Sequence, residues 1–340
     1  MNRRIPLTVI TGFLGSGKTT IVRAFLRRPG FHNTAVIINE FGAIGIDHDL
    51  IESSREDLVA LRTGCLCCAM QGDLAHTVRR LMAASATGKA PAFDRILLET
   101  SGMADPAPIL QTAIVDPYLS ETVEIVNVVV TVDALNGPAV IKEHDEARRQ
   151  VALGDRVLIT KSDIDAGAAE IAAHAVRAYR PDVALDKSVN GDIEPELLFE
   201  PAANRLAWQL ALSETGDLHR THAHDAAVTT VSLRVEAPIH AVALTLFLQA
   251  LAENCGPDLL RVKGIVSIRE SPASPAVVHG VQHVFHPIEW LDKWPSDDRS
   301  SRFVLIGRRL DADWLNLMLR TIEEEVEQAT RQEDKPKATL

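Results

Sequence analysis

The first two thirds of the chain alternate short apolar runs with longer stretches of mixed polarity. The apolar runs, which are rich in Val, Ile and Leu, are residues 6–11, 35–39, 95–100, 126–134 and 156–160. Continuous apolar runs of this kind are typical of strands that are buried on both faces, as in a parallel sheet. The intervening stretches that are long enough for crossover helices include residues 18–28, 72–86 and 139–152. This pattern predicts an α/β fold with a doubly wound, mostly parallel sheet.

The character of the sequence changes near residue 213. Residues 213–227 are polar, contain His219, His222 and His224, and have few branched apolar residues, which is typical of a linker. Beyond it, strand-like and helical stretches follow in the order βαβββα, which predicts a smaller α+β domain with mostly antiparallel strands. We therefore expect three segments besides the linker: a first domain over residues 1–212, a second over 228–325 and a charged tail over 326–340.

Composition and charge narrow the function classes. A length of 340 residues fits two domains at roughly 100–200 residues each. The formal net charge of −11 disfavours binding to the phosphate backbone of nucleic acid or to an anionic membrane. No apolar run approaches the ~20 residues that cross a bilayer, and the basic start lacks the apolar core of a signal peptide. A cytoplasmic protein is expected.

Residues Gly12 to Thr20 match the pattern G-x-x-x-x-G-K-[ST] between a predicted strand and a predicted helix. Glycines let backbone amides turn inward around phosphate oxygens, and the following helix points its positive end at the same oxygens. Lys18 is expected to reach the β and γ phosphates and to be catalytic, and the Thr19 hydroxyl to hold Mg²⁺. The phosphate-binding candidates are Gly12, Gly15, Ser16, Gly17, Lys18, Thr19 and Thr20. A glycine-rich turn without this role is the weaker alternative, because the whole pattern and both flanks are present.

A carboxylate that can serve the phosphate loop follows a later apolar run. Glu99 lies at the end of the run 95–100, and Ser101 and Gly102 come next. Glu99 is expected to orient a water on Mg²⁺ or to position the attacking water. The backbone amide of Gly102 is a candidate sensor of the γ phosphate. The alternative is that Glu99 is only a strand-end carboxylate that caps the next loop.

Residues 160–163, Thr-Lys-Ser-Asp, follow another apolar run and fit the guanine-binding pattern Asn/Thr-Lys-x-Asp. The candidate nucleotide-binding residues here are Thr160, Lys161 and Asp163. The Asp163 carboxylate can accept two N–H donors of guanine, whereas adenine offers no such pair. GTP is therefore the expected nucleotide. Residues 188–191 lie where a last loop on the guanine side would fall, although their residue types do not identify it.

Three cysteines, Cys65, Cys67 and Cys68, lie within a segment of four residues. Without a secretory signal, such a cluster indicates metal or redox chemistry rather than a disulfide framework. Thiolates suit zinc, cobalt and copper(I), and residues two apart in an extended segment point to the same side. An incomplete ligand set would make the cluster a metal-transfer site. A redox pair and buried small hydrophobic residues are the alternatives.

The remaining cysteine and the histidines give weaker indications of function. Cys255 precedes Gly256 and Pro257 and is expected to be structural. The linker histidines could hold a metal loosely or simply lie in a solvated loop. His279, His283 and His286 follow one strand pattern, which favours ordinary sheet positions.

The combination and order of these motifs resemble the CobW-type metallochaperone GTPases, which are relatives of the nickel-insertion GTPases for urease and hydrogenase. The matching segments are Gly12–Thr20, Asn39–Gly42, Gly64–Cys68, Glu99–Pro106 and Thr160–Asp163. In the second domain, Arg261–Gly264 and Phe303–Gly307 are similar to hallmarks of the family, so the resemblance covers residues 5–325. The sequence departs from many members at Thr160, where they carry Asn, and from some at Ala43, where they carry an acidic metal ligand.

The resemblance implies a P-loop GTPase that binds GTP, Mg²⁺ and either zinc or cobalt(II), and that delivers the zinc or cobalt to a client metalloprotein. It implies that residues 39–47 form a nucleotide-sensing switch and that the thiolates lie near the Mg²⁺ site. The rival interpretation is a metal-sensing or client-docking switch that hydrolyses GTP without handing over a metal. A small-molecule kinase is disfavoured, because it has no use for the guanine loop or the cysteines. The physiological metal, the client and a homodimeric state are left open.

The guanine-binding pattern generates a first prediction. GTP should bind far more tightly than ATP, and Asp163→Asn should lower the affinity for GTP ~100-fold or more, because the new amide cannot accept both guanine N–H donors. Xanthosine triphosphate should become the better ligand, since its 2-oxo group accepts from that amide. Direct titration of the three nucleotides tests this, and equal binding of ATP and GTP by the wild type would contradict it.

Overall fold

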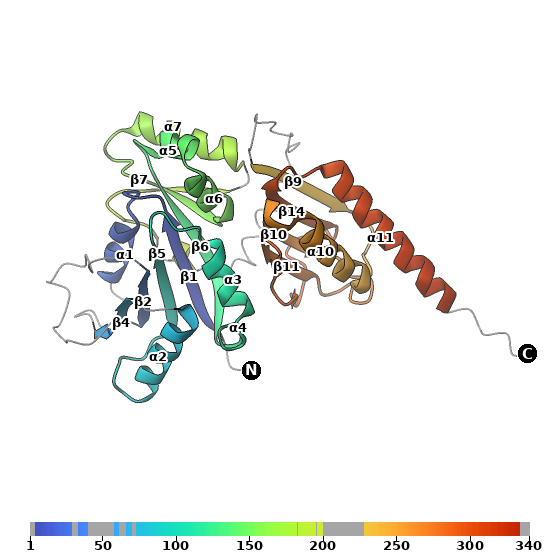
Figure 1. Cartoon of the computed structure of the whole chain (residues 1–340), viewed down its shortest axis with the longest axis horizontal. Coiled ribbons are helices and arrows are strands. Elements are labelled where there is room, and N and C mark those ends of the chain that lie inside the picture. Colours follow the sequence, from blue (N-terminus) through green and yellow to red (C-terminus); the bar gives the residue numbers. More distant parts are fainter. Residues whose placement is uncertain are drawn as a thin grey trace, which may run out of the picture. The chain divides into compact units, whose positions relative to one another are not determined.

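The computed structural model describes residues 4–28, 33–39, 58–60, 66–69, 73–181, 183–194, 196–199 and 228–333. The chain divides into two compact units, residues 1–202 and 203–340, each with its own sheet and helices (Figure 1). The expected linker, residues 213–227, lies outside the described residues, so the domain limits at 212 and 228 stay predictions. In the described part of the chain, no helix combines the length and the hydropathy needed to cross a membrane.

The first unit is built on an eight-stranded sheet with the strand order β3-β4-β2-β5-β1-β6-β7-β8. The strands are β1 (Ile5–Gly12), β2 (Thr34–Asn39), β3 (Leu58–Ala60), β4 (Leu66–Ala69), β5 (Arg95–Thr100), β6 (Val123–Asp133), β7 (Arg156–Thr160) and β8 (Ala184–Ser188). All neighbouring strands are parallel except β3 and β4, which are antiparallel. The expected doubly wound, mostly parallel sheet is confirmed.

Three of these strands, β3, β4 and β8, were not expected from the sequence. The segment of β8 reads ALDKS, and only its last residue is buried. In the described sheet β8 pairs with β7 alone, so its polar side chains can reach water. Because hydrophobic patterning detects strands that are buried, it does not detect a polar strand at the edge.

Helices cover both faces of this sheet. They are α1 (Lys18–Leu26), α2 (Leu74–Ala86), α3 (Ala107–Val115), α4 (Pro117–Thr122), α5 (Gly137–Glu143), α6 (Asp145–Leu153), α7 (Ala166–Tyr179) and α8 (Glu196–Phe199). Helices α1 and α8 share one core cluster, whereas α5, α6 and α7 share another that contacts alternate residues of β6 and β7. The single helix expected over 139–152 is interrupted at His144, which has the extended angles φ −116° and ψ 122°.

Strand β1 lies where the order of strands along the chain reverses. It pairs with β5 on one side and with β6 on the other. In open parallel sheets, ligands bind at the carboxyl ends of the strands at such a reversal. We therefore expect the ligand-binding site at the carboxyl ends of β1, β5, β6 and β7.

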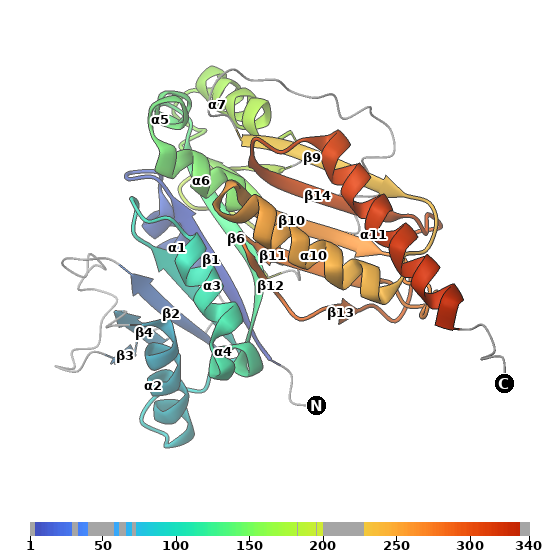
Figure 2. The ribbon, with the colours of Figure 1, turned by 45° about the vertical axis from the view of Figure 1, so that its right-hand side comes forward.

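The second unit has a six-stranded sheet with the order β12-β11-β10-β14-β9, and β13 pairs with β11. The strands are β9 (Val228–Val235), β10 (Leu259–Val266), β11 (Ala276–Val281), β12 (Val284–Phe285), β13 (Glu289–Trp290) and β14 (Ser301–Arg308). Their pairing is antiparallel. Helices α10 (Ala241–Cys255) and α11 (Ala312–Glu333) lie side by side on one face of this sheet, and the short 3₁₀ helix η3 (Gly256–Asp258) follows α10 (Figure 2). The expected α+β layer is confirmed.

The structure refines two details of this unit. The strand-like stretch over residues 276–285 is a hairpin of β11 and β12, which turns at Gln282 with φ 54°. The final helix, which the sequence predicts over residues 311–329, is α11 and ends at Glu333, so it includes the first residues of the charged segment 326–340. Arg331 and Glu327 form an i,i+4 ion pair of 2.9 Å there, and Val326 packs against the core.

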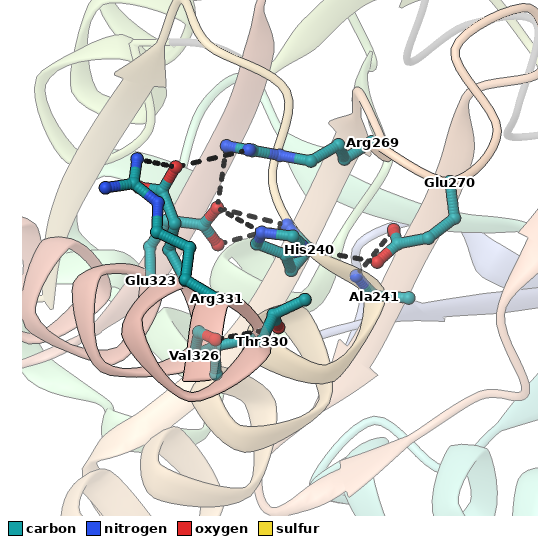
Figure 3. Close-up of polar contacts among 9 residues, drawn as sticks. His240, Ala241, Arg269, Glu270, Glu323, Val326, Thr330 and Arg331 are labelled. Carbon is teal, nitrogen blue, oxygen red and sulfur yellow. Dashed lines mark hydrogen bonds and ion pairs between the residues drawn. The ribbon is translucent and has the colours of Figure 1, made fainter. Parts of the chain in front are cut away.

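The amino end of α10 is capped by carboxylates from other elements (Figure 3). The backbone N–H of His240 donates to Glu323 Oε2 at 3.0 Å, and that of Ala241 donates to Glu270 Oε2 at 3.0 Å. The His240 ring is mostly buried, with Nδ1 3.1 Å from Glu270 Oε1 and Nε2 3.9 Å from Glu323 Oε1. Arg269 reaches Glu323 at 3.5 Å. Helix α10 thus has its free N–H groups satisfied by acidic residues of α11 and of the loop after β10.

This cap makes the stability of the second unit depend on pH. Burial raises the pKa of Glu270, but hydrogen bonds from the His240 ring and from backbone N–H groups outweigh burial and leave the pKa below its ordinary value of 4.5. A carboxyl group whose pKa is lowered in the folded state stabilises that state above its ordinary pKa. The contribution is lost as the pH falls through the lowered value.

We therefore expect the second unit of Glu270→Gln to lose less stability than the wild type between about pH 5 and pH 3. Three of the four tryptophans, Trp290, Trp294 and Trp314, lie in the described part of this unit, so tryptophan fluorescence during urea unfolding reports mainly on it. Glu253→Gln, an exposed change on α10, is the matched control and should keep the wild-type pH slope. Identical pH slopes for all three proteins would contradict a stabilising role for the Glu270 carboxylate.

Candidate functional site

The loop between β1 and α1 forms a tight turn at the carboxyl end of β1. Gly12, Gly15 and Gly17 have φ angles of 141°, 71° and 94°, which side chains disfavour. A Cβ atom on Gly12 would lie 2.3 Å from Thr131 Oγ1, so β6 approaches this loop too closely for any side chain. The glycine pattern of the sequence therefore matches a conformation that requires it.

Lys18, the first residue of α1, bends back over the loop. It is only 5% exposed, and its Nζ donates to the carbonyl oxygens of Gly12 at 3.0 Å and Phe13 at 3.1 Å. The ammonium group thus lies against the loop, where backbone amides and the amino end of α1 also favour an anion. Thr20 follows in the first turn of α1 and is exposed.

A hydroxyl and a carboxylate meet beside the phosphate loop. Thr19 Oγ1 donates to Glu99 Oε1 at 2.6 Å, although the two residues are 80 positions apart. Glu99 is 1% exposed and pairs in register with Ile10, so the β1–β5 ladder brings it to the loop. Because the Thr19 hydroxyl gives its proton to Glu99, its lone pairs can face a cation. Hard oxygen donors of this kind are the ligands that Mg²⁺ prefers, so the two residues fit that ion.

Hydroxyl groups from two other strands hold the phosphate loop. Ser16 Oγ lies 2.5 Å from Thr131 Oγ1 of β6, and it donates to Phe13 O at 2.7 Å. Thr160 Oγ1, at the end of β7, donates to Ser16 O at 2.7 Å. Thr160 is therefore in contact with the phosphate loop, as well as being the first residue of the expected guanine loop. The sequence interpretation did not include Thr131, which lies inside an apolar run.

The expected guanine loop has a partner that the sequence interpretation missed. Lys161 has φ 56°, and its ammonium group forms an ion pair with Asp133 at the end of β6. Burial raises the pKa of Asp133, but hydrogen bonds from Lys161, Leu135 and Asn136 outweigh burial and leave the pKa below its ordinary value. Asp133 is therefore charged at neutral pH. A carboxylate at the end of an apolar run is the signal that identified Glu99, and it could also have identified Asp133 in the run 126–134.

The loop that follows β8 lies next to the guanine loop. Ser162 Oγ donates to Ser188 O at 3.4 Å, and a Cβ on Gly191 would lie 2.6 Å from the Thr20 carbonyl oxygen. Residues 188–191 are thus in contact with both the Thr160–Asp163 segment and α1. Asp163 itself is exposed, as a residue that contacts a base must be before binding.

The cysteine cluster is only partly described. Cys65 lies outside the described residues, as does the expected switch beyond Asn39, and for Cys67 and Cys68 the structure describes the backbone in β4. In register, Ala69 of β4 and Glu99 of β5 both pair with Ile38 of β2. Two strand spacings amount to about 10 Å, so the cysteine strand runs close to the Glu99 end of the sheet. Among the residues whose side chains are described, no three potential ligands converge on a metal site.

Comparison with known proteins gives matches along both units. The family model described as CobW/HypB/UreG, nucleotide-binding domain, matches residues 6–184. The model described as Cobalamin synthesis protein cobW C-terminal domain matches residues 228–323. The zinc chaperone YjiA of Escherichia coli K12 is 29% identical over 306 residues, covering 90% of this chain and 95% of YjiA. The zinc chaperone CobW of Pseudomonas aeruginosa is 31% identical over 366 residues, covering 94% of this chain and 91% of CobW.

Solved structures of YjiA share the fold. The Zn(II)-bound YjiA GTPase from E. coli superposes with a TM-score of 0.71 at 27% identity, covering 94% of this chain and 99% of YjiA. A triple mutant of YjiA, with one glutamate and two cysteines replaced by alanine, is also Zn(II)-bound and has a TM-score of 0.72 at 26% identity.

The position of Lys18 generates a prediction. Lys18→Ala should lower GTP turnover by ~100-fold or more, because the group that neutralises phosphate charge is lost. The circular dichroism spectrum should not change, since the Nζ bonds that are lost reach loop carbonyls rather than core groups. Lys89→Ala, an exposed lysine after α2, is the control and should keep full turnover. Full turnover in Lys18→Ala, or loss of its fold, would contradict the assignment.

Proposed function

The chain belongs to the CobW/HypB/UreG family of P-loop GTPases, and from this premise we propose that it uses GTP to carry zinc or cobalt(II) to a client metalloprotein. The observation that carries this proposal is the 2.6 Å hydrogen bond between Thr19 and Glu99 beside the phosphate loop. Glu99 belongs to β5, which pairs with β2, and β2 pairs with β4, the strand that carries Cys67 and Cys68. The bond therefore joins the phosphate loop to the part of the sheet that leads to the cysteines.

In this proposal, the amides of the phosphate loop and the amino end of α1 bind the phosphates of GTP. Lys18 exchanges its bonds with the Gly12 and Phe13 carbonyls for bonds with phosphate oxygens. Asp163 accepts the N–H donors of guanine, and Thr160 keeps the guanine loop attached to the phosphate loop through Ser16. These residues position the nucleotide, which is the main requirement for phosphoryl transfer.

Thr19 and Glu99 are the residues that would hold Mg²⁺, which when bound neutralises charge on the β and γ phosphates. Glu99 keeps the Thr19 hydroxyl in one orientation, because its buried carboxylate accepts the hydroxyl proton at 2.6 Å. The same carboxylate is close enough to the phosphate loop to position a water molecule. Gly102, three residues further along, offers a backbone amide on the γ-phosphate side.

The transferred metal is assigned to the thiolates of Cys65, Cys67 and Cys68. Zinc is supported by relatives that are zinc chaperones, and cobalt(II) has the same preference for thiolates. Thiols have an ordinary pKa of about 8.5, so a metal-binding site must lower the cost of deprotonation. A loop that brings the sulfurs together only in the GTP state would bind metal with GTP and release it after hydrolysis. The release would be to a client metalloprotein, which the chaperone relatives support.

This coupling is testable by competition titration with a chromophoric zinc chelator. Zinc affinity should be 5–150-fold higher with a non-hydrolysable GTP analogue than with GDP, for a typical coupling of ~1–3 kcal/mol. Zinc must then tighten binding of the GTP analogue by the same factor. Cys67→Ala and Cys68→Ala should abolish the difference. Cys255→Ala, at the end of α10, is the matched cysteine control and should preserve it.

The stoichiometry of bound zinc must be measured together with the affinity. Because a YjiA mutant without two cysteines is still Zn(II)-bound, zinc retained by the cysteine variants would report a second class of site. Equal zinc affinity in the GDP and GTP-analogue states would contradict coupled delivery. A rate of zinc transfer to an acceptor that does not respond to GTP hydrolysis would favour the sensing switch over the chaperone.

A further inference from the structure

Helix α6 contacts the loop that follows Glu99. Gln150 is 1% exposed, and its Nε2 donates to the carbonyl oxygens of Gly102 at 3.2 Å and Ala104 at 3.0 Å. The preceding residue, Arg149, forms an ion pair of 3.0 Å with Asp105. Two successive residues of α6 therefore hold one short loop by side-chain bonds to three of its residues.

The amide of Gln150 serves this loop through its donors. An apolar side chain of the same length would leave the carbonyl oxygens of Gly102 and Ala104 without these hydrogen bonds. The Gln150 Oε1 is buried and has no hydrogen-bond partner among the described residues, so the donors are what orient this side chain. The buried amide therefore contributes its contact with the loop.

The loop that Gln150 holds lies directly on the phosphate loop. A Cβ on Gly102 would lie 2.7 Å from Leu14 Cδ2 and 2.9 Å from the backbone nitrogen of Leu14, so only glycine fits. The phosphate loop also contacts the junction of α5 and α6, where Phe13 stacks on His144 with ring centroids 4.5 Å apart. The region around α6 thus contacts both the phosphate loop and the loop that carries Gly102.

A cavity of about 220 Å³ lies between the phosphate loop and helices α5 and α6, and Phe13, Leu14, Ile141 and Gln150 are among its lining residues. Side-chain packing is therefore incomplete on this side, and directional bonds contribute to the position of the loop there. Gln150 supplies one such bond to Gly102 and one to Ala104.

We propose that Gln150 is a positioning residue for GTP hydrolysis, which holds Gly102 where its backbone amide meets the γ phosphate. The inference rests on the proposed role of the Glu99–Gly102 segment in the GTPase reaction. It gives α6 a function beyond packing, because two of its side chains hold the loop that carries Gly102.

The test is Gln150→Met, which keeps the length of the side chain and removes its donors. We expect kcat for GTP hydrolysis to fall about 10- to 100-fold, as for a small misplacement of a reacting group. Affinity for GDP should stay within about twofold, because Lys18 and the guanine loop are untouched. The control is Val151→Ala, the next residue of α6, which is buried in the core and should lower the melting temperature while leaving kcat unchanged.

A second variant tests the same loop if Gln150→Met does not fold. Arg149→Met removes the ion pair with Asp105 from a side chain that is 38% exposed, so folding is expected to be retained while kcat falls by a smaller factor. The inference is overturned if folded Gln150→Met keeps the wild-type kcat, if Arg149→Met keeps it where Gln150→Met does not fold, or if kcat and GDP affinity fall together, as general destabilisation would produce. Absence of GTP hydrolysis in the wild type would instead overturn the proposed function on which the inference rests.

Discussion

The phosphate loop keeps its shape because hydroxyl groups from two neighbouring strands satisfy its polar atoms. Ser16 is 3% exposed; its carbonyl accepts from Thr160 of β7, and its hydroxyl contacts Thr131 of β6 as well as Phe13 O. A buried polar group left without a partner costs about 1–3 kcal/mol, which is a large fraction of the stability of a domain. The conformation of the loop therefore depends on the ends of β6 and β7 as well as on its own glycines.

Strand register carries this constraint across the sheet. Asp133 pairs with Thr160 and Ile10 pairs with Glu99, so the carboxyl ends of four strands meet at one edge. A slip of one residue would turn each of these side chains to the opposite face of the sheet. The contacts between Thr19 and Glu99 and between Lys161 and Asp133 are thus consequences of the same ladder that forms the core. A change of strand register would therefore disturb this edge and the core of the first unit together.

In the second unit, the free N–H groups at the amino end of α10 also need partners from other elements. His240 precedes the helix without a side-chain cap of its own, and Glu323 and Glu270 accept the first N–H groups instead. The two acids come from α11 and from the loop after β10, so the cap also joins the elements that pack on α10. Phe247 of α10 meets Phe303 of β14 edge-on at 5.6 Å beneath this cap. Polar capping and apolar packing therefore hold the same pair of helices on the sheet.

The sequence by itself determined the features that depend on neighbours along the chain. The apolar runs predict five of the parallel strands, and the phosphate pattern predicts the strand, turn and helix around Gly12 to Thr20, because both signals are local. The positions of Glu99 and Thr160 at the ends of strands were also predicted, since strand ends follow from the runs. Only the tertiary structure decided three contacts between distant residues. Lys161 pairs with Asp133, 28 residues away, and Gln150 donates to Gly102, 48 residues away. Thr131 contacts Ser16, 115 residues away. The sequence did not predict the edge strand β8 for a related reason. Its polar side chains are compatible with a strand only because they can reach water at the edge of the described sheet. Contacts between distant residues arise from strand order and register, and a single sequence fixes these only through the complete set of packing interactions in the fold.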